Sequence, residues 1–222
     1  MPEQEALIPT MKRIDKEENK IRIPFVNIAL IFMFILLLIG STFVNINIQH
    51  FILPKNYFGG GELAKNDYIY SFYIIPQIPV LMFMCSALGK KLATTCISLY
   101  FLLGMTFLPI FALGGGLGYI TEYSFGYIFA YIPAILIAGN ILNKKYSFLN
   151  MILAAFAAVL IIHVTGISYM ALLALIKHDG GMFIKGWIGA QSGIKIIYDF
   201  ILSFLGILIG KYFRVFLKFI SD

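Results

Sequence analysis

Long apolar runs limit what this chain of 222 residues can fold into more than any other feature. Several runs are long enough to cross a bilayer, which takes about 20 residues of helix. Hydrophobic residues make up 60% of the chain and charged residues 13%, whereas soluble domains carry about half apolar and about a quarter charged residues. The sequence therefore predicts an all-α integral membrane protein.

The apolar runs predict a bundle of six transmembrane helices within one membrane domain over 23–217. The expected spans are 23–44, 70–88, 92–113, 119–142, 148–176 and 188–217. A polar segment, 1–22, precedes the domain, and a short tail, 218–222, follows it. The first apolar run is too long for the core of a signal peptide, so we expect it to be retained as the first span.

Basic residues are distributed unevenly between the predicted loops. One side of the membrane would hold twelve of the seventeen: Lys12, Arg13, Lys16, Lys20, Arg22, Lys90, Lys91, Lys144, Lys145, Lys211, Arg214 and Lys218. The other side would hold Lys55, Lys65, Lys177 and Lys185. Positive charge accumulates in cytoplasmic loops, so both termini are expected in the cytoplasm. The net charge of +6 then reflects topology, with no nucleic-acid partner.

The orientation places the loop over 45–69 on the outer face, where it is either a lid or a plain connector. The chain has no Walker loop, H-E-x-x-H pair or G-x-S-x-G elbow, so we expect neither an enzyme nor a cofactor site. Cys85 and Cys96 fall in predicted spans and are expected to be small packing residues.

Charged residues inside the predicted spans are few. Lys195 and Asp199 stand four residues apart on the last helix and would share one face. They either neutralise each other or present a donor and an acceptor to a polar ligand. Glu122 lies at the outer start of the fourth span.

Three uncharged polar residues also fall within the predicted spans. Gln77, between two prolines, is expected either to contact a ligand or to make a helix–helix hydrogen bond. His163 is expected to be an interhelical contact, and the sequence identifies no carboxylate partner for it. Ser192 precedes a glycine, as in some intramembrane serine proteases, but those enzymes place the histidine on a later helix.

Tyrosines recur at every fourth position of the helix predicted over 119–142: Tyr119, Tyr123, Tyr127 and Tyr131. A stripe that runs this far into the bilayer favours an aromatic wall beside a ligand cavity over an interfacial anchor. Immediately before them stand Gly114, Gly115 and Gly116. This glycine run is predicted to form a turn at the outer mouth, where its backbone can approach a ligand closely.

Several motifs occur in a fixed order. Gln77 stands twelve residues before Gly-Lys-Lys-Leu at 89–92. Leu-Pro-Ile-Phe at 108–111, the glycine cluster at 114–118 and Thr-Glu-Tyr-Ser-Phe-Gly-Tyr at 121–127 follow. Over roughly 70–217 the chain resembles the BioY family, the biotin-specific S-components of energy-coupling factor (ECF) transporters. That family reads P-x-T-L-Q, G-P-R-L-G, L-P-V-F, a glycine cluster and L-G-P-T-G-G-Y.

The family also carries a late G-D-x-x-K motif. Asp199 falls on its aspartate, Leu202 occupies the position of its lysine, and Lys195 lies one turn earlier. The resemblance implies a plasma-membrane protein that binds biotin at the outer face. It also implies partners: a transmembrane coupling subunit and ATP-binding subunits that supply the energy.

Biotin offers a ureido ring, an apolar bicycle and a carboxylate. Under the resemblance, Asp199 would suit the ureido N–H groups, Gln77 the ureido carbonyl, the Tyr119–Tyr127 face the bicycle, and Lys195 the carboxylate. Three alternatives stay open: a different small vitamin, an intramembrane hydrolase built on Ser192 and His163, and a non-transporting scaffold.

Overall fold

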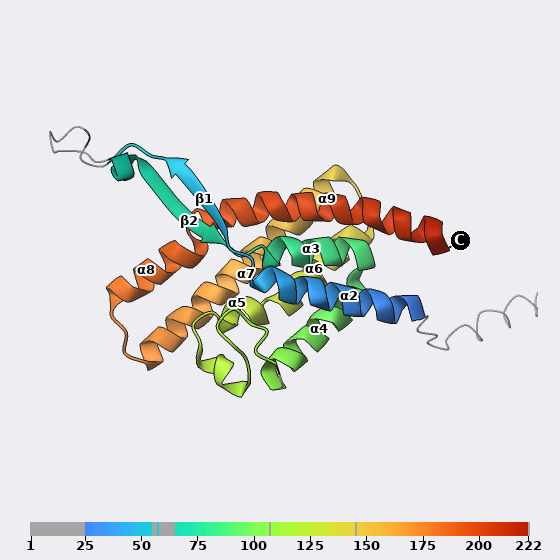
Figure 1. Cartoon of the computed structure of the whole chain (residues 1–222), viewed down its shortest axis with the longest axis horizontal. Coiled ribbons are helices and arrows are strands. Elements are labelled where there is room, and N and C mark those ends of the chain that lie inside the picture. Colours follow the sequence, from blue (N-terminus) through green and yellow to red (C-terminus); the bar gives the residue numbers. More distant parts are fainter. Residues whose placement is uncertain (1–24, 55–56, 58–64, 107, 145, 222) are drawn as a thin grey trace, which may run out of the picture.

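The chain forms a helical bundle with one projecting β-hairpin (Figure 1). The computed structural model describes residues 25–54, 57, 65–106, 108–144 and 146–221, so the predicted segment 1–22 lies outside the described residues. The elements are α2 (Phe25–Thr42), β1 (Ile46–Phe51), η1 (Lys65–Tyr68), β2 (Ile69–Ile74), α3 (Gln77–Leu88), α4 (Lys90–Thr106), η2 (Leu117–Thr121), α5 (Phe125–Phe129), α6 (Tyr131–Lys144), α7 (Phe148–Ile176), α8 (Gly181–Ser192) and α9 (Lys195–Ser221).

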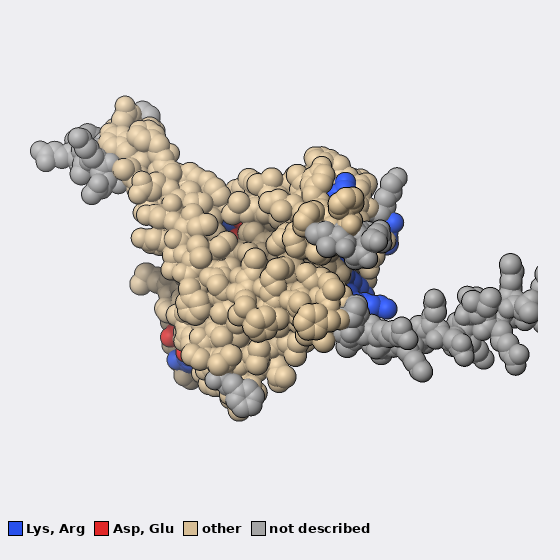
Figure 2. All heavy atoms as spheres, turned by 45° about the vertical axis from the view of Figure 1, so that its right-hand side comes forward, with Lys and Arg blue, Asp and Glu red and all other residues tan. Residues whose placement is uncertain are grey.

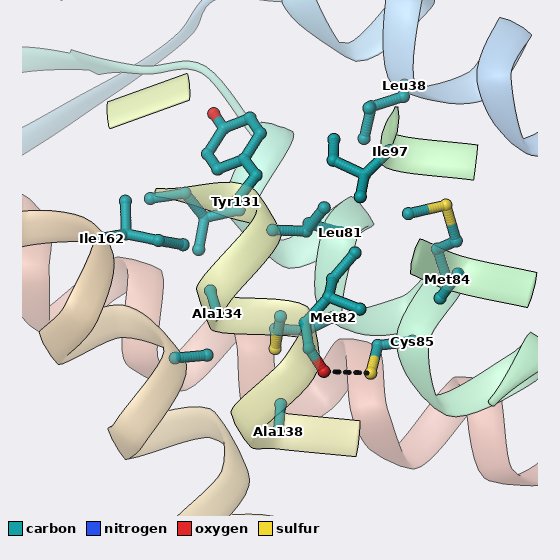
Figure 3. Packing of buried hydrophobic residues seen from close by; sticks show 14 of the residues in the cluster. Leu38, Leu81, Met82, Met84, Cys85, Ile97, Tyr131, Ala134, Ala138 and Ile162 are labelled. Atoms are coloured by element: carbon teal, nitrogen blue, oxygen red, sulfur yellow. Dashed lines mark hydrogen bonds between the residues drawn. The ribbon is translucent and has the colours of Figure 1, made fainter. Parts of the chain in front are cut away.

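The core of the bundle is built around α3, which contacts α2, α4, α6 and α9. Figure 3 shows Leu81, Met82 and Cys85 of α3 among side chains from the neighbouring helices. The Cys85 thiol donates to the Ile135 carbonyl at 3.8 Å. Both cysteines, including Cys96, are buried and free, in line with the packing role predicted for them.

Helices α3 and α9 make the most extensive contact of any two elements. A Cβ atom on Gly206 would lie 2.6 Å from the Pro79 carbonyl oxygen, and one on Gly210 would lie 2.7 Å from the Phe83 carbonyl oxygen. Real Cβ atoms do not approach backbone this closely, so glycine is what allows the two helices to pack at this distance. This packing fixes α9, which carries Lys195 and Asp199.

The segment before α3 is a strand, which corrects the helix predicted over 70–88. β2 pairs antiparallel with β1, with Ile46 opposite Ile74 and Phe51 opposite Ile69. The run Ile-Tyr-Ser-Phe-Tyr-Ile at 69–74 is β-branched and aromatic, which favours a strand when a partner strand is available. Hydropathy alone does not separate such a strand from a helix. The hairpin extends away from the bundle beyond the start of α9 (Figure 1).

Three other predicted helices are also shorter or broken. The helix expected over 92–113 occupies Lys90–Thr106, because the chain reverses through Pro109 and a bridge between Phe111 and Gly114. The helix expected over 119–142 divides into η2, α5 and α6, and the one over 188–217 into α8 and α9. Helix α7 has the expected bounds, 148–176.

Among the described residues, four segments are long and apolar enough to cross a membrane: Phe25–Thr42, Phe125–Lys144, Phe148–Ile176 and Gly181–Leu217. Large apolar side chains such as Ile197, Ile201 and Leu205 are exposed on α9, as expected for a surface that faces lipid. The chain is therefore a multi-pass membrane protein. α2 begins and α9 ends at the same end of the bundle (Figure 1), and Lys and Arg side chains gather there (Figure 2).

The contact between α3 and α9 predicts which glycine is essential for stability. Gly210→Ala should lower the free energy of unfolding by about 1–3 kcal/mol, because its methyl group would overlap the backbone of α3. Gly40→Ala is the matched control, since a Cβ there would have no atom within 4 Å and alanine favours helix. Thermal unfolding in detergent measures both, and equal melting temperatures for the two variants would contradict this account of the packing.

Candidate functional site

A buried carboxylate marks the polar centre of the bundle. Asp199, in the second turn of α9, is 3% exposed. Its Oδ2 atom lies 3.1 Å from Nε2 of His163, which projects from α7 and is equally buried. Among the described residues, His163 is the side chain that hydrogen-bonds to the Asp199 carboxylate. The Lys195–Asp199 pair that the spacing allowed is not formed, because Asp199 faces α7.

The hydrogen bonds continue from His163 to two further elements. Nδ1 of His163 lies 2.9 Å from the Ser192 hydroxyl, and that hydroxyl lies 2.6 Å from the Tyr127 hydroxyl. Asp199, His163, Ser192 and Tyr127 thus form one chain of hydrogen bonds, here called the polar chain. It joins α9, α7, the end of α8, and α5.

The break between α8 and α9 puts Ser192 into this chain. A Cβ on Gly193 would lie 2.4 Å from the Gly189 carbonyl oxygen, so the tight path from α8 into α9 requires glycine. Ser192 is the last residue of α8, with its hydroxyl directed at His163. The sequence presented 188–217 as one apolar run, and it left a pairing of Ser192 with His163 as one open alternative.

Glycines also position Tyr127. A Cβ on Gly166 of α7 would lie 2.5 Å from the Tyr127 ring, and one on Gly126 of α5 would lie 2.3 Å from Cβ of Tyr169. The two helices therefore approach closely, and the Tyr127 ring meets the His163 ring edge-on at 5.8 Å between centroids. This contact directs the Tyr127 hydroxyl to Ser192.

Gln77 lies in a separate buried cluster. Its Nε2 donates to the Thr42 hydroxyl at 2.6 Å and to the Tyr100 hydroxyl at 3.0 Å, while its Oε1 accepts from the Tyr131 hydroxyl at 3.0 Å. Both amide hydrogens are thus engaged within the protein. This matches the interhelical hydrogen bond that was one interpretation of Gln77. Its contact with a ligand stays a prediction and would require one of these bonds to be exchanged.

A hollow of about 470 Å³ runs along one face of α8. It is lined by Phe183, Gly186, Trp187, Ala190 and Gln191. The Tyr123 ring packs on two of these side chains, at 5.1 Å from Phe183 and 5.7 Å from Trp187. Gln191 accepts a hydrogen bond from Lys195 Nζ at 3.4 Å. An aromatic-lined hollow therefore has a lysine ammonium at its edge, next to the polar chain.

The four tyrosines do not share one helix face, which corrects the predicted stripe. The Tyr119 hydroxyl lies 3.0 Å from the Ser124 hydroxyl, and its ring packs on Phe111. Tyr123 lies between η2 and α5, where it donates to Asp179 at the end of α7. Of the four, only Tyr127 and Tyr131 lie one turn apart on a continuous helical path, and each reaches a different buried cluster.

The glycine run is a turn packed on the end of α4. Gly114 and Gly116 have φ angles of 120° and 81°, which disfavour other residues. A Cβ on Gly115 would lie 2.4 Å from the Leu108 carbonyl oxygen, and the Gly116 N–H donates to the Gly104 carbonyl at 2.7 Å. Close backbone approach within the protein explains these glycines, and their contact with a ligand stays a prediction.

Comparison with known proteins then identifies the family. The sequence model of the BioY family matches residues 15–218. The chain belongs to the BioY family. This confirms the resemblance drawn from the motifs. A search of curated proteins gives no match.

The BioY-family fold is also found among solved structures. One similar structure is described as the crystal structure at 2.1 Å of the S-component for biotin from an ECF-type ABC transporter. The TM-score is 0.61 with 17% sequence identity, over 85% of this chain and 90% of that chain. At this identity the likeness concerns the fold.

The titration of Tyr123 reports the contact between the segment that joins η2 to α5 and the turn after α7. Its hydrogen bond to the Asp179 carboxylate raises the pKa of the Tyr123 phenol from 10.0 to about 12. The bond is therefore fully present below pH 10 and is lost as the pH rises through about 12. Asp179→Asn should return this pKa toward its ordinary value, because it removes the carboxylate. Tyrosinate absorbance, with Tyr123→Phe to identify the signal, measures the shift, and an unchanged titration in Asp179→Asn would contradict the contact.

Proposed function

We propose that this BioY-family protein is an S-component that binds biotin with high affinity at the outer face of the plasma membrane. It delivers biotin inward together with a transmembrane coupling subunit and ATP-binding subunits. The observation that carries the proposal is the family match over 15–218. The shared fold with a solved S-component for biotin supports it.

The proposed topology has six membrane passes with both termini in the cytoplasm. The passes would be α2, α3, α4, α5 with α6, α7, and α8 with α9, although α3 and α4 are shorter than the four long segments. Lys and Arg side chains gather at the end where α2 begins and α9 ends, which supports a cytoplasmic location for that end. The hollow along α8 then opens toward the outer half of the bundle, where capture from outside is possible.

The chemistry of biotin fits the residues around this hollow. Trp187 and Phe183 offer an aromatic wall for the apolar bicycle. Asp199 offers carboxylate oxygens for the two ureido N–H groups, and Tyr127 is linked to it through Ser192 and His163. Lys195 makes one long hydrogen bond, to Gln191, so its ammonium is placed to bind the carboxylate of the tail.

One observation favours a second candidate function, an intramembrane hydrolase. Ser192, His163 and Asp199 are joined by hydrogen bonds of 2.9 Å and 3.1 Å, the arrangement of a nucleophile, a base and an orienting carboxylate. Their order in the chain is no obstacle, because such sets occur in several orders. However, the Ser192 hydroxyl is also bonded to Tyr127 and is 3% exposed.

A serine-reactive fluorophosphonate separates the two candidates. A transport subunit should show no labelling, whereas labelling of the intact protein that disappears in Ser192→Ala would support the hydrolase.

A panel of small vitamins separates biotin from other substrates of the same transport class. If another vitamin raises the melting temperature of the purified protein and biotin does not, that vitamin replaces biotin as the proposed substrate. The S-component assignment would stay in place.

Biotin binding should depend on the Asp199 carboxylate. Biotin at about 100 times its dissociation constant should stabilise the purified protein by about 2.7 kcal/mol, and this shift should be lost in Asp199→Asn. Asp179→Asn is the matched control, because that carboxylate bonds Tyr123 and takes no part in the polar chain. Titration calorimetry with biotin measures all three proteins. An unchanged affinity in Asp199→Asn would contradict the site.

A further inference from the structure

His163 stands between the carboxylate of Asp199 and the end of α8. Its two ring nitrogens are both engaged, one with Asp199 at 3.1 Å and the other with Ser192 at 2.9 Å. The ring is 3% exposed. A group that connects a carboxylate on one helix to a hydroxyl on another can transmit the position of the second helix to the first.

We propose that His163 is a positioning residue for ligand binding. It orients the Asp199 carboxylate through Nε2–H, and Ser192 fixes the tautomer in which it can do so, so that the ligand site is complete only when α8 is seated. The inference rests on the proposed biotin-binding function, and it adds to that function a role for His163, Ser192 and Tyr127.

The donors and acceptors determine one arrangement for a neutral ring. An ionised Asp199 only accepts hydrogen bonds, so Nε2 of His163 must carry the hydrogen. Nδ1 then accepts, and the Ser192 hydroxyl must donate to it. The Ser192 oxygen in turn accepts from the Tyr127 hydroxyl. Every group in the polar chain is then satisfied, and the Nε2–H tautomer is selected by the hydroxyl at the end of α8.

Ser192 is also the anchor of α8. Of the twelve residues of α8, all of which the structure describes, Ser192 is the buried one. Glycines stand at both ends of the helix: Gly180 precedes it, Gly181 is its first residue and Gly193 follows it. At its other end, Phe183 packs on Tyr123. The same helix lines the hollow. A ligand bound in the hollow therefore contacts the helix whose Ser192 sets the tautomer of His163.

Loss of this connection should weaken ligand binding without unfolding the bundle. Without the Ser192 hydroxyl, Nδ1 of His163 has lost its donor and the other tautomer becomes available. In that tautomer Nε2 faces a carboxylate with no hydrogen between them, and the carboxylate is no longer held in one orientation. The cost of fixing the carboxylate in one orientation then falls on ligand binding, so Asp199 should bind its ligand less tightly.

The test uses the full-length protein in detergent, with biotin as the probe. His163→Leu should weaken biotin binding by about ten- to a hundred-fold, because the carboxylate loses its donor. His163→Gln should recover most of that loss, since a glutamine amide can donate to Asp199. Ser192→Ala should weaken binding by about ten-fold.

Ser203→Ala is the matched control for Ser192→Ala. Ser203 is fully buried on α9, one turn beyond Asp199, and its hydroxyl has no hydrogen-bond partner among the described residues. Both substitutions remove one buried hydroxyl from the same bundle. Ser203→Ala should leave the affinity for biotin unchanged, and an equal loss in both variants would overturn the proposal in favour of a general packing effect.

A second readout follows the tautomer directly and needs no ligand. Nitrogen-15 NMR of protein labelled at histidine should show His163 as the Nε2–H tautomer, with the signal identified from His163→Gln. In Ser192→Ala the same ring should show a mixture of tautomers. A ring whose tautomer is unaffected by Ser192→Ala would overturn the proposal.

The two readouts keep this inference separate from the proposed function. If the wild-type protein does not bind biotin but the tautomer changes in Ser192→Ala, the function fails and the positioning role stands. If biotin binds and the variants of His163 and Ser192 bind it as tightly as the wild type, the function stands and the positioning role fails. Retained binding in Ser203→Ala with losses in the other variants supports both.

Discussion

The pairing of Asp199 with His163 is the interaction on which the rest of the site depends. An ionised carboxylate without a partner in the apolar interior of a membrane bundle is strongly disfavoured. At 3% exposure, Asp199 needs a donor from a neighbouring helix, and His163 of α7 supplies it. That requirement brings α7 and α9 together at this level, while the other ring nitrogen brings in the end of α8.

The same pairing separates the two charges of α9. If Asp199 and Lys195 neutralised each other, neither would be available to a ligand. Because His163 takes the carboxylate, Lys195 is left with a long hydrogen bond to Gln191 at the edge of the hollow. A ligand with N–H donors at one end and an anionic group at the other, with an apolar body between, suits this division. Biotin has that form, and this division of roles is what we propose for the two charges.

The sequence alone identified the class of protein, and it singled out the two charges of α9 on which the proposed site rests. Long apolar runs indicated a multi-pass helical bundle, and the order of motifs indicated the BioY family, as the family match confirms. The sequence could not show that Asp199 turns toward α7, because spacing along one helix says nothing about which neighbour that face meets. It therefore identified no carboxylate partner for His163, and it paired His163 with Ser192 only in the hydrolase alternative.

Other differences have equally local causes. A β-branched and aromatic run became β2 because β1 lies upstream as a partner strand, with Ile46 opposite Ile74 and Phe51 opposite Ile69. The tyrosine stripe was lost because the chain leaves helical geometry between η2 and α5. The glycine run was predicted to contact a ligand. Packing within the protein explains it, because a Cβ on Gly115 would lie only 2.4 Å from the carbonyl oxygen of Leu108, which follows α4. Close packing of the backbone and close approach of a ligand both require glycine, so the sequence alone does not distinguish the two causes.

The division of labour between Asp199 and Lys195 is the central claim, and it is tested most directly by comparing biotin with its methyl ester. The ester keeps the ureido ring and the bicycle and removes the negative charge. The wild-type protein should bind biotin about ten-fold or more tightly than the ester, because the ester cannot form the charge-assisted hydrogen bond with the partly buried Lys195. Lys195→Met should bind both ligands with the same affinity. A wild-type protein that does not distinguish them, or a Lys195→Met protein that still prefers biotin, would contradict the account.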